Sequence, residues 1–134
     1  MQIRHVLVRV DDQDKALAFY TSKLGFVKNL DIPMGKMRWL TVTSPEEAGG
    51  VEIVLETDDF PPARKAKKIL YEAGFPVTVL TTNDIHADYQ RLKDIGVKFR
   101  STPKDDGLVT FVFFEDTCGN LISLQTVGQS PDLG

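Results

Sequence analysis

The chain has 134 residues, 42% of them hydrophobic and 26% charged, with one cysteine and a formal net charge of −3. These values predict a single cytoplasmic domain, 1–134, and they exclude a disulfide framework because Cys118 has no partner within the chain. The mildly acidic balance, the lack of a long apolar run and the lack of a signal-peptide pattern argue against nucleic acid and membrane as partners.

The first half of the chain predicts a βαβββ order. The β-branched run IRHVLVRV, 3–10, indicates a strand, and Asp11 or Asp12 is placed to cap a helix over 13–24 that Gly25 ends. Three further strand-like runs follow, FVKNL, MRWLTVT and VEIVLET. We call this half, about 3–57, module one.

A connecting helix is predicted over 61–74. Pro61 and Pro62 suit its first turn, and Gly74 suits its end. Four apolar residues share one face at helical spacing, and we expect that face to be buried. They are Ala66, Ile69, Leu70 and Ala73.

The second half repeats the order of the first. Residues 77–82 indicate a strand, Asp84 is placed to cap a helix, and Gly96 ends that helix. The runs VKFRS, LVTFVFFE and NLISLQT supply three more strands. We call this half, about 75–127, module two, and we expect the remaining tail, 128–134, to be flexible. The repeated order indicates an internal duplication.

Three stretches carry a family resemblance: IRHVLVRV, ALAFYTSKLGF and FEDTCGNLISL. Together they resemble the glyoxalase/bleomycin-resistance/extradiol-dioxygenase superfamily, also called vicinal oxygen chelate, over about 3–127. The family more often has Asp-Pro-Asp-Gly-Asn where this chain has Thr117 and Cys118 within DTCGN. The resemblance implies an α+β fold in which two tandem βαβββ modules form a curved, mixed, eight-stranded sheet around a cleft.

The resemblance also implies one divalent metal ion, held by His, Gln or Glu side chains from the first and last strand of each module. The internal repeat places these four positions at His5, Val54, Val77 and Ser123. Valine cannot coordinate a metal and serine is a poor ligand, so we expect a degenerate site and no metal cofactor. The alternative is one divalent ion held by His5, Glu52 and Glu56, because Glu52 and Glu56 share a strand face.

The expected cleft contains few polar groups among apolar and aromatic side chains. His5 is either a hydrogen-bonding group of the cleft, a structural histidine or a metal ligand. Glu56 and Gln125 occupy matching strands and are suited to orient a polar ligand. The full set expected to line the cleft is His5, Trp39, Val54, Glu56, Val77, Ser123 and Gln125.

The resemblance implies a protein that binds a small organic molecule, as metal-free members of the superfamily do. Such binders commonly form homodimers, and exposed strand edges favour the same here. The alternative function is a divalent-metal-dependent lyase, isomerase or dioxygenase that uses His5 with Glu52 or Glu56. A third is a partner-binding module with a vestigial cleft. No catalytic residue is assigned from the sequence.

Overall fold

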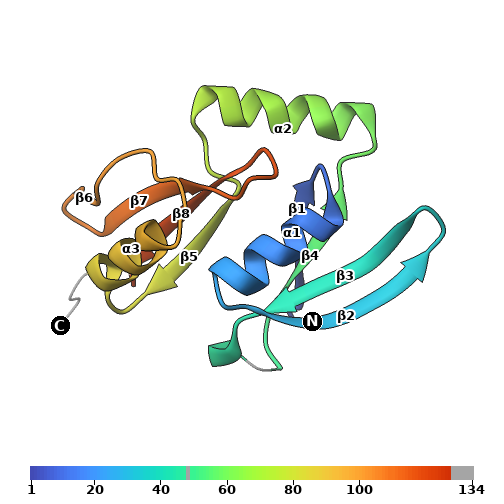
Figure 1. Cartoon of the computed structure of the whole chain (residues 1–134), viewed down its shortest axis with the longest axis horizontal. Coiled ribbons are helices and arrows are strands. Elements are labelled where there is room, and N and C mark those ends of the chain that lie inside the picture. The colour runs from blue at the N-terminus through green and yellow to red at the C-terminus, as the bar shows by residue number, and fades with distance from the viewer. Residues whose placement is uncertain (48, 128–134) are drawn as a thin grey trace.

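The computed structural model describes residues 1–47 and 49–127, so the tail predicted to be flexible, 128–134, lies outside the described residues. Both modules have the predicted order (Figure 1). Module one contains β1 (His5–Val10), α1 (Gln13–Ala18), the π-helical turn η1 (Phe19–Lys23), β2 (Val27–Met34), β3 (Met37–Thr43), the 3₁₀ turn η2 (Pro45–Glu47) and β4 (Glu52–Thr57). The connecting helix is α2 (Pro61–Ala73), and module two contains β5 (Thr78–Thr82), α3 (Ile85–Asp94), β6 (Lys104–Asp105), β7 (Thr110–Glu115) and β8 (Leu121–Thr126).

The eight strands are hydrogen-bonded as two four-stranded mixed sheets, one in each module. Sheet A has the order β1-β4-β3-β2 and sheet B the order β5-β8-β7-β6. In each sheet the first strand is parallel to the last, and the other neighbours are antiparallel. The predicted α+β class and the two βαβββ modules are therefore confirmed, and β1 and β5 are both edge strands.

The predicted helix ends are confirmed. The Asp12 carboxylate accepts a hydrogen bond from the Lys15 backbone N–H at 3.0 Å, which caps α1. Asp84 accepts in the same way from the Ala87 N–H at 3.1 Å, which caps α3. Gly25 and Gly96 have φ angles of 78° and 95°, so both helices end at a residue that tolerates the left-handed region.

The strand predicted over 97–101 is wrong. Among the described residues this segment makes only an isolated bridge, between Phe99 and Phe114, and the strand that pairs with β7 is β6. The Phe99 ring instead packs against Tyr89 at 4.7 Å and Phe114 at 5.7 Å between ring centroids. These aromatic contacts, with backbone hydrogen bonds of 2.9 Å from the Arg100 N–H to the Phe113 carbonyl and from the Glu115 N–H to the Lys98 carbonyl, hold the segment beside β7 without a continuous ladder.

The hydrophobic core lies on the side of each sheet that faces α1 and α3. The opposite side of each sheet carries no helix of its own module, and we call it the open face. The core residues come from both modules and form one cluster, so the two halves fold around shared apolar contacts. They include Val8, Val10, Leu40, Val42 and Leu55 from sheet A, Val112, Phe114, Ile122 and Leu124 from sheet B, and Ala16, Phe19, Tyr20, Ile85 and Leu92 from the helical segments.

The apolar face of α2 is exposed, and the prediction that it would be buried is wrong. No residue of α2 is buried, and Ile69 is 54% exposed. The inward side instead carries Lys67, whose Nζ lies 2.7 Å from Asp58 Oδ2 and donates to the Cys118 carbonyl at 2.7 Å. Periodicity identified the residues that share a face, but these polar contacts decide which face points inward. Within the described part of the chain no helix is both long and apolar enough to cross a bilayer.

Candidate functional site

The open face of sheet A is lined by polar and apolar side chains in alternating rows. Because side chains alternate along a strand, every second residue of β1 lies on this face, and the paired positions of β4 lie beside them. The rows contain His5, Leu7 and Arg9 from β1, Glu52, Val54 and Glu56 from β4, and Trp39 and Thr41 from β3. The sequence correctly predicted that Glu52, Val54 and Glu56 share a face.

A histidine–carboxylate pair lies at one end of this face. His5 Nε2 is 3.1 Å from Glu52 Oε2, and the His5 and Trp39 rings meet edge to face at 5.6 Å. The other Glu52 oxygen accepts hydrogen bonds from Asn29 Nδ2 and from Thr41 Oγ1, the latter at 3.0 Å. These hydrogen bonds, that of Asn29 first, lower the pKa of the buried Glu52 carboxyl. Glu52 is therefore a carboxylate at neutral pH that accepts hydrogen bonds from three side chains.

Glu56 lies two residues beyond Val54 and does not join the His5–Glu52 pair. Its Oε2 is 3.5 Å from the Arg9 guanidinium. That separation makes an ion pair but not a hydrogen bond, and this buried oxygen has no hydrogen-bond partner among the described residues. The open face of sheet A therefore carries two separate charged pairs, with Leu7 and Val54 between them.

The open face of sheet B is far less polar than that of sheet A. Val79 pairs with Ser123, and Thr81 pairs with Gln125, in the same parallel arrangement as β1 and β4. The Val77 N–H bonds to the Leu121 carbonyl at 2.9 Å at the start of this ladder. Beside it on β7, the Phe111 and Phe113 rings lie 5.5 Å apart between centroids. The β5 and β8 positions of this face, with Phe111 and Phe113 beside them, thus present aliphatic, aromatic and neutral polar groups.

The register relates the two open faces position by position. Leu7 faces Val54 in sheet A, and Val79 faces Ser123 in sheet B, which agrees with the equivalences expected from the repeat. By the same register His5 and Glu52 correspond to Val77 and Leu121, and Arg9 and Glu56 correspond to Thr81 and Gln125. The ionisable pairs of one module are therefore replaced in the other by neutral side chains.

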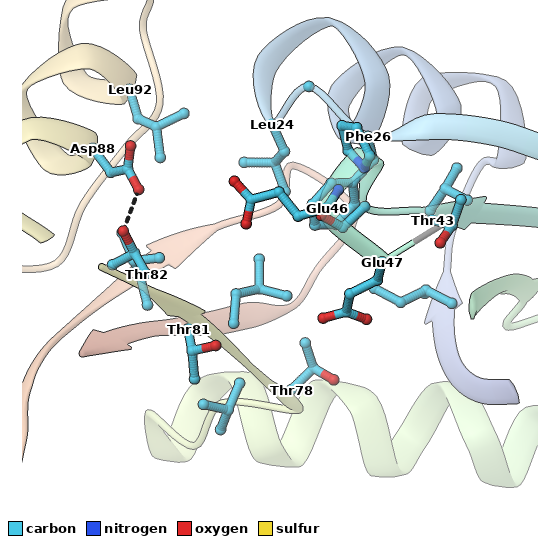
Figure 2. A pocket seen from close by; sticks show the side chains of 18 of the residues that line it. Leu24, Phe26, Thr43, Glu46, Glu47, Thr78, Thr81, Thr82, Asp88 and Leu92 are labelled. Atoms are coloured by element: carbon cyan, nitrogen blue, oxygen red, sulfur yellow. Dashed lines mark hydrogen bonds between the residues drawn. The ribbon is translucent and has the colours of Figure 1, made fainter. Parts of the chain in front are cut away.

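A groove of about 730 Å³ opens between the modules (Figure 2), lined in module one mainly by residues on the helix side of sheet A and in module two by all five residues of β5, Thr78–Thr82. Its apolar floor combines side chains from the two halves, including Val6, Phe26, Val42, Ile53, Leu80, Phe114 and Leu124. Its acidic residues are Glu46, Glu47, Asp84 and Asp88. Figure 2 shows the Glu46 and Glu47 side chains extending from one wall, across from Asp88 and Thr82, which are hydrogen-bonded at 2.6 Å on the other.

None of the seven residues expected to line a cleft is among the residues that line this groove. They lie on the open faces, whereas the groove is lined by chain neighbours such as Val6 beside His5 and Ile53 beside Val54, together with Val79 and Thr81 at the edge of the open face of sheet B. The signal that could have pointed to the groove is the acidic pair Glu46–Glu47, which follows β3 directly.

A buried hydrogen-bond network joins the modules near the turn between β7 and β8. Asp116 accepts from the Tyr20 hydroxyl at 2.9 Å, from the backbone N–H of Cys118 at 2.8 Å and from Asn120 Nδ2 at 2.8 Å. The same Asn120 amide donates to the Arg9 carbonyl at 2.7 Å. Burial and the Asp116 charge raise the pKa of Tyr20 well above its usual range. The network is a structural connection between module two and module one.

Cys118 is a structural residue of this turn. Its side chain is fully buried, and burial followed by the Asp116 charge raises the pKa of the thiol to about 12. A thiol in that state is a poor nucleophile at neutral pH. The second histidine, His86, is exposed on α3.

The comparisons with known proteins agree with this architecture. The family model described as Glyoxalase/Bleomycin resistance protein/Dioxygenase superfamily matches residues 2–124. The chain belongs to this superfamily. It is 46% identical over 124 residues to the uncharacterized protein YurT of Bacillus subtilis (strain 168), a match that covers 92% of this chain and 98% of that protein.

Two solved structures are similar over almost the whole chain. UcmS2 has a TM-score of 0.82 and 35% identity, with 95% of this chain and 98% of that chain covered. TnmS3, an antibiotic binding protein from Streptomyces sp. CB03234, has a TM-score of 0.74 and 30% identity, with 94% and 95% covered. Both likenesses extend across module one and module two.

The residues of the open faces do not match the donor set of a superfamily metal site. Of the four expected positions, Val54 and Val77 are aliphatic and Ser123 is a buried hydroxyl, which leaves His5 as a single imidazole. In the alternative set, Glu56 lies with Arg9 rather than with His5 and Glu52. Within residues 1–47 and 49–127, no group of three His, Cys, Asp or Glu side chains is arranged so that it could hold a metal ion.

Proposed function

We propose that this protein binds a small, partly aromatic organic molecule on its open faces, without a metal ion. The observation that carries the proposal is the His5–Glu52 pair beside the Trp39 ring. An ionised carboxylate that orients an imidazole supplies a directed hydrogen-bonding group, and the adjacent indole supplies an apolar surface. The likeness to TnmS3, an antibiotic binding protein, supports the same class of ligand.

The binding unit in this proposal is a homodimer in the cytoplasm. Leu7 and Val79 lie on the two open faces and are 52% and 54% exposed. Each belongs to an edge strand whose outer backbone groups have no strand partner within the described chain. A second copy would cover these side chains and turn two shallow faces into an enclosed cleft. We expect a molecular mass in solution near twice the 15.0 kDa of one chain, measured by light scattering. A mass that stays at one chain at all concentrations would contradict the dimer.

The binding experiment can use the single tryptophan of the chain, because Trp39 contacts His5 on the proposed face. A panel of aromatic antibiotics is titrated while Trp39 fluorescence and the melting temperature are recorded. A ligand present at about 100 times its Kd adds about 2.7 kcal/mol to the free energy of unfolding, which a melting experiment resolves. We expect at least one compound to bind, and His5→Ala to weaken it, while the exposed His86→Ala serves as the matched control.

The competing assignment is the divalent-metal-dependent lyase, isomerase or dioxygenase. It requires a divalent ion near one equivalent per chain that His5→Ala removes and His86→Ala retains. Metal analysis of the purified protein, followed by titration with Mn²⁺, Ni²⁺ and Zn²⁺, decides between the two assignments. A stoichiometric ion lost with His5 would overturn the metal-free proposal.

A further inference from the structure

The groove between the modules is an opening into the hydrophobic core. Its floor includes the fully buried Val42 and Phe114, while Ile53, Leu80 and Phe26 line it and remain only partly buried. Packed protein interiors leave few voids larger than a water molecule, so a core open over about 730 Å³ is unusual. That volume lies within the range of about 300–1,000 Å³ typical of ligand pockets.

The charged groups around this apolar floor are almost all acidic. Glu46 and Glu47 come from η2, and Asp84 and Asp88 come from the start of α3 across the groove. The single basic residue of the lining, Arg91, is already paired with Asp88 at 3.3 Å. The rim therefore keeps a net negative charge at neutral pH.

The four acidic side chains differ in what they already contact. Asp88 accepts from Thr82, and Asp84 caps α3, so both are engaged in local structure. Glu46 and Glu47 are exposed, and within the described residues their carboxylates take part in no ion pair or side-chain hydrogen bond. They are the groups free to meet a ligand.

We propose that this groove is a second ligand site, distinct from the His5–Glu52 pair, which binds an organic monocation with an apolar body. The apolar floor removes the body of the ligand from water, and each square ångström so buried contributes about 25 cal/mol. The acidic rim attracts the cationic group and disfavours anions of the same shape, because low-dielectric walls strengthen the local field. A bare metal ion is a poor alternative occupant, since it makes no use of the apolar floor.

The test is a matched pair of probes, phenylbutylamine and phenylbutyrate, which share an apolar body and carry opposite charge. Isothermal titration calorimetry on the full chain measures both Kd values at low and high salt. We expect the amine to bind, the carboxylate to bind at least about tenfold more weakly, and the affinity for the amine to fall as salt rises.

Variants separate the rim from the total charge of the protein. Replacing both Glu46→Gln and Glu47→Gln should weaken amine binding about tenfold, because two exposed carboxylates no longer attract the cation. The control removes the same charge elsewhere, through Asp59→Asn and Glu72→Gln, and should leave the Kd unchanged. Thr78→Trp should fill the groove and abolish binding, and His5→Ala on the open face should leave it intact.

Three results would overturn the groove proposal while leaving the open-face proposal standing. The first is equal binding of the amine and the carboxylate. The second is an equal loss of amine affinity in the rim variant and in the charge control. The third is no amine binding by the wild type; if the molecular mass of Thr78→Trp also falls from dimer to monomer, the groove is a contact between copies.

Discussion

The two open faces share one backbone design and differ in their chemistry. Sheet A carries two charged pairs, one of them the His5–Glu52 pair, whereas the matching positions of sheet B are Val77, Leu121, Thr81 and Gln125. The β-ladder registers agree in the two modules, so the difference is confined to the side chains. The two modules thus share the backbone positions of the site but carry different side chains there. The backbone geometry of a site therefore does not by itself determine its chemistry.

The segments before the last strand of each module also differ, in the burial and the hydrogen bonding of their acidic side chains. Asp116 in module two is buried and accepts four hydrogen bonds, whereas Glu47 in module one is exposed at the groove. Asp116→Ala should lower the free energy of unfolding by about 3 kcal/mol or more, because it leaves buried donors without an acceptor. Glu47→Ala should change it by less than about 0.5 kcal/mol. Urea denaturation measures both, and equal losses would contradict the asymmetry.

The charged pair of sheet A can be neutralised without changing its shape. Glu52→Gln should lower stability at pH 7 by about 2 kcal/mol, because Asn29 and Thr41 then donate to a neutral amide oxygen instead of a carboxylate and His5 loses the oxygen it faces. The pKa of Glu52 is lowered by folding, so its contribution is complete above the ordinary value of 4.5 and disappears as the pH falls through the folded value. The variant should therefore show a flatter loss of stability in acid than the wild type.

The control for that experiment is Glu56→Gln on the same strand. Glu56 Oε2 has no hydrogen-bond partner, so the neutral amide removes little that stabilises the fold. Its stability should stay within about 0.5 kcal/mol of the wild type. A larger loss in Glu56→Gln than in Glu52→Gln would show that the Arg9 pair, and not the His5 pair, organises this face.

Removing the Tyr20 hydroxyl tests one hydrogen bond of the network that connects the two modules. Tyr20→Phe keeps the buried ring and deletes one hydrogen bond to Asp116, which should lower the free energy of unfolding by about 1 kcal/mol. Combined with Asp116→Ala, it should add almost nothing, since the two side chains act on each other. Additive losses of unfolding free energy in this double-mutant cycle would contradict a direct interaction between Tyr20 and Asp116.

The smallest expected effect is an increase in the free energy of unfolding. Thr117 is the only non-glycine residue among those described with a positive φ, at 68°, and a β-branched side chain is strained there. Thr117→Gly should raise the free energy of unfolding by about 0.5 kcal/mol, the relief of strain being partly offset by a more flexible unfolded chain. Thermal unfolding of the variant beside the wild type measures the sign.

Local sequence signals predicted the fold well. The caps at Asp12 and Asp84 and the stops at Gly25 and Gly96 depend on a few adjacent residues, so the helix boundaries could be read without tertiary information. The internal repeat then predicted which positions of the two modules correspond, and the register agrees. The strand expected over 97–101 failed because the contacts of Phe99 are made with residues distant in sequence.

The site was less predictable, because a strand pattern defines two faces without saying what each one meets. The seven expected residues were placed on common faces, but the groove is lined mainly by their neighbours, such as Val6 and Ile53. The orientation of α2 was missed for the same reason. The contacts of Lys67 with the Cys118 carbonyl and of Tyr71 with Glu115 are long-range, and they outweigh the apolar stripe.

The buried thiol of Cys118 has a practical consequence. It is the sole cysteine of the chain and lies in the turn whose hydrogen bonds connect the two modules. A thiol reagent can reach it only when this turn opens, so the labelling rate in native buffer reports the free energy of that opening. The labelling rate of Cys118 therefore measures how often the contact between module one and module two opens. A ligand that stabilises this contact should lower the labelling rate.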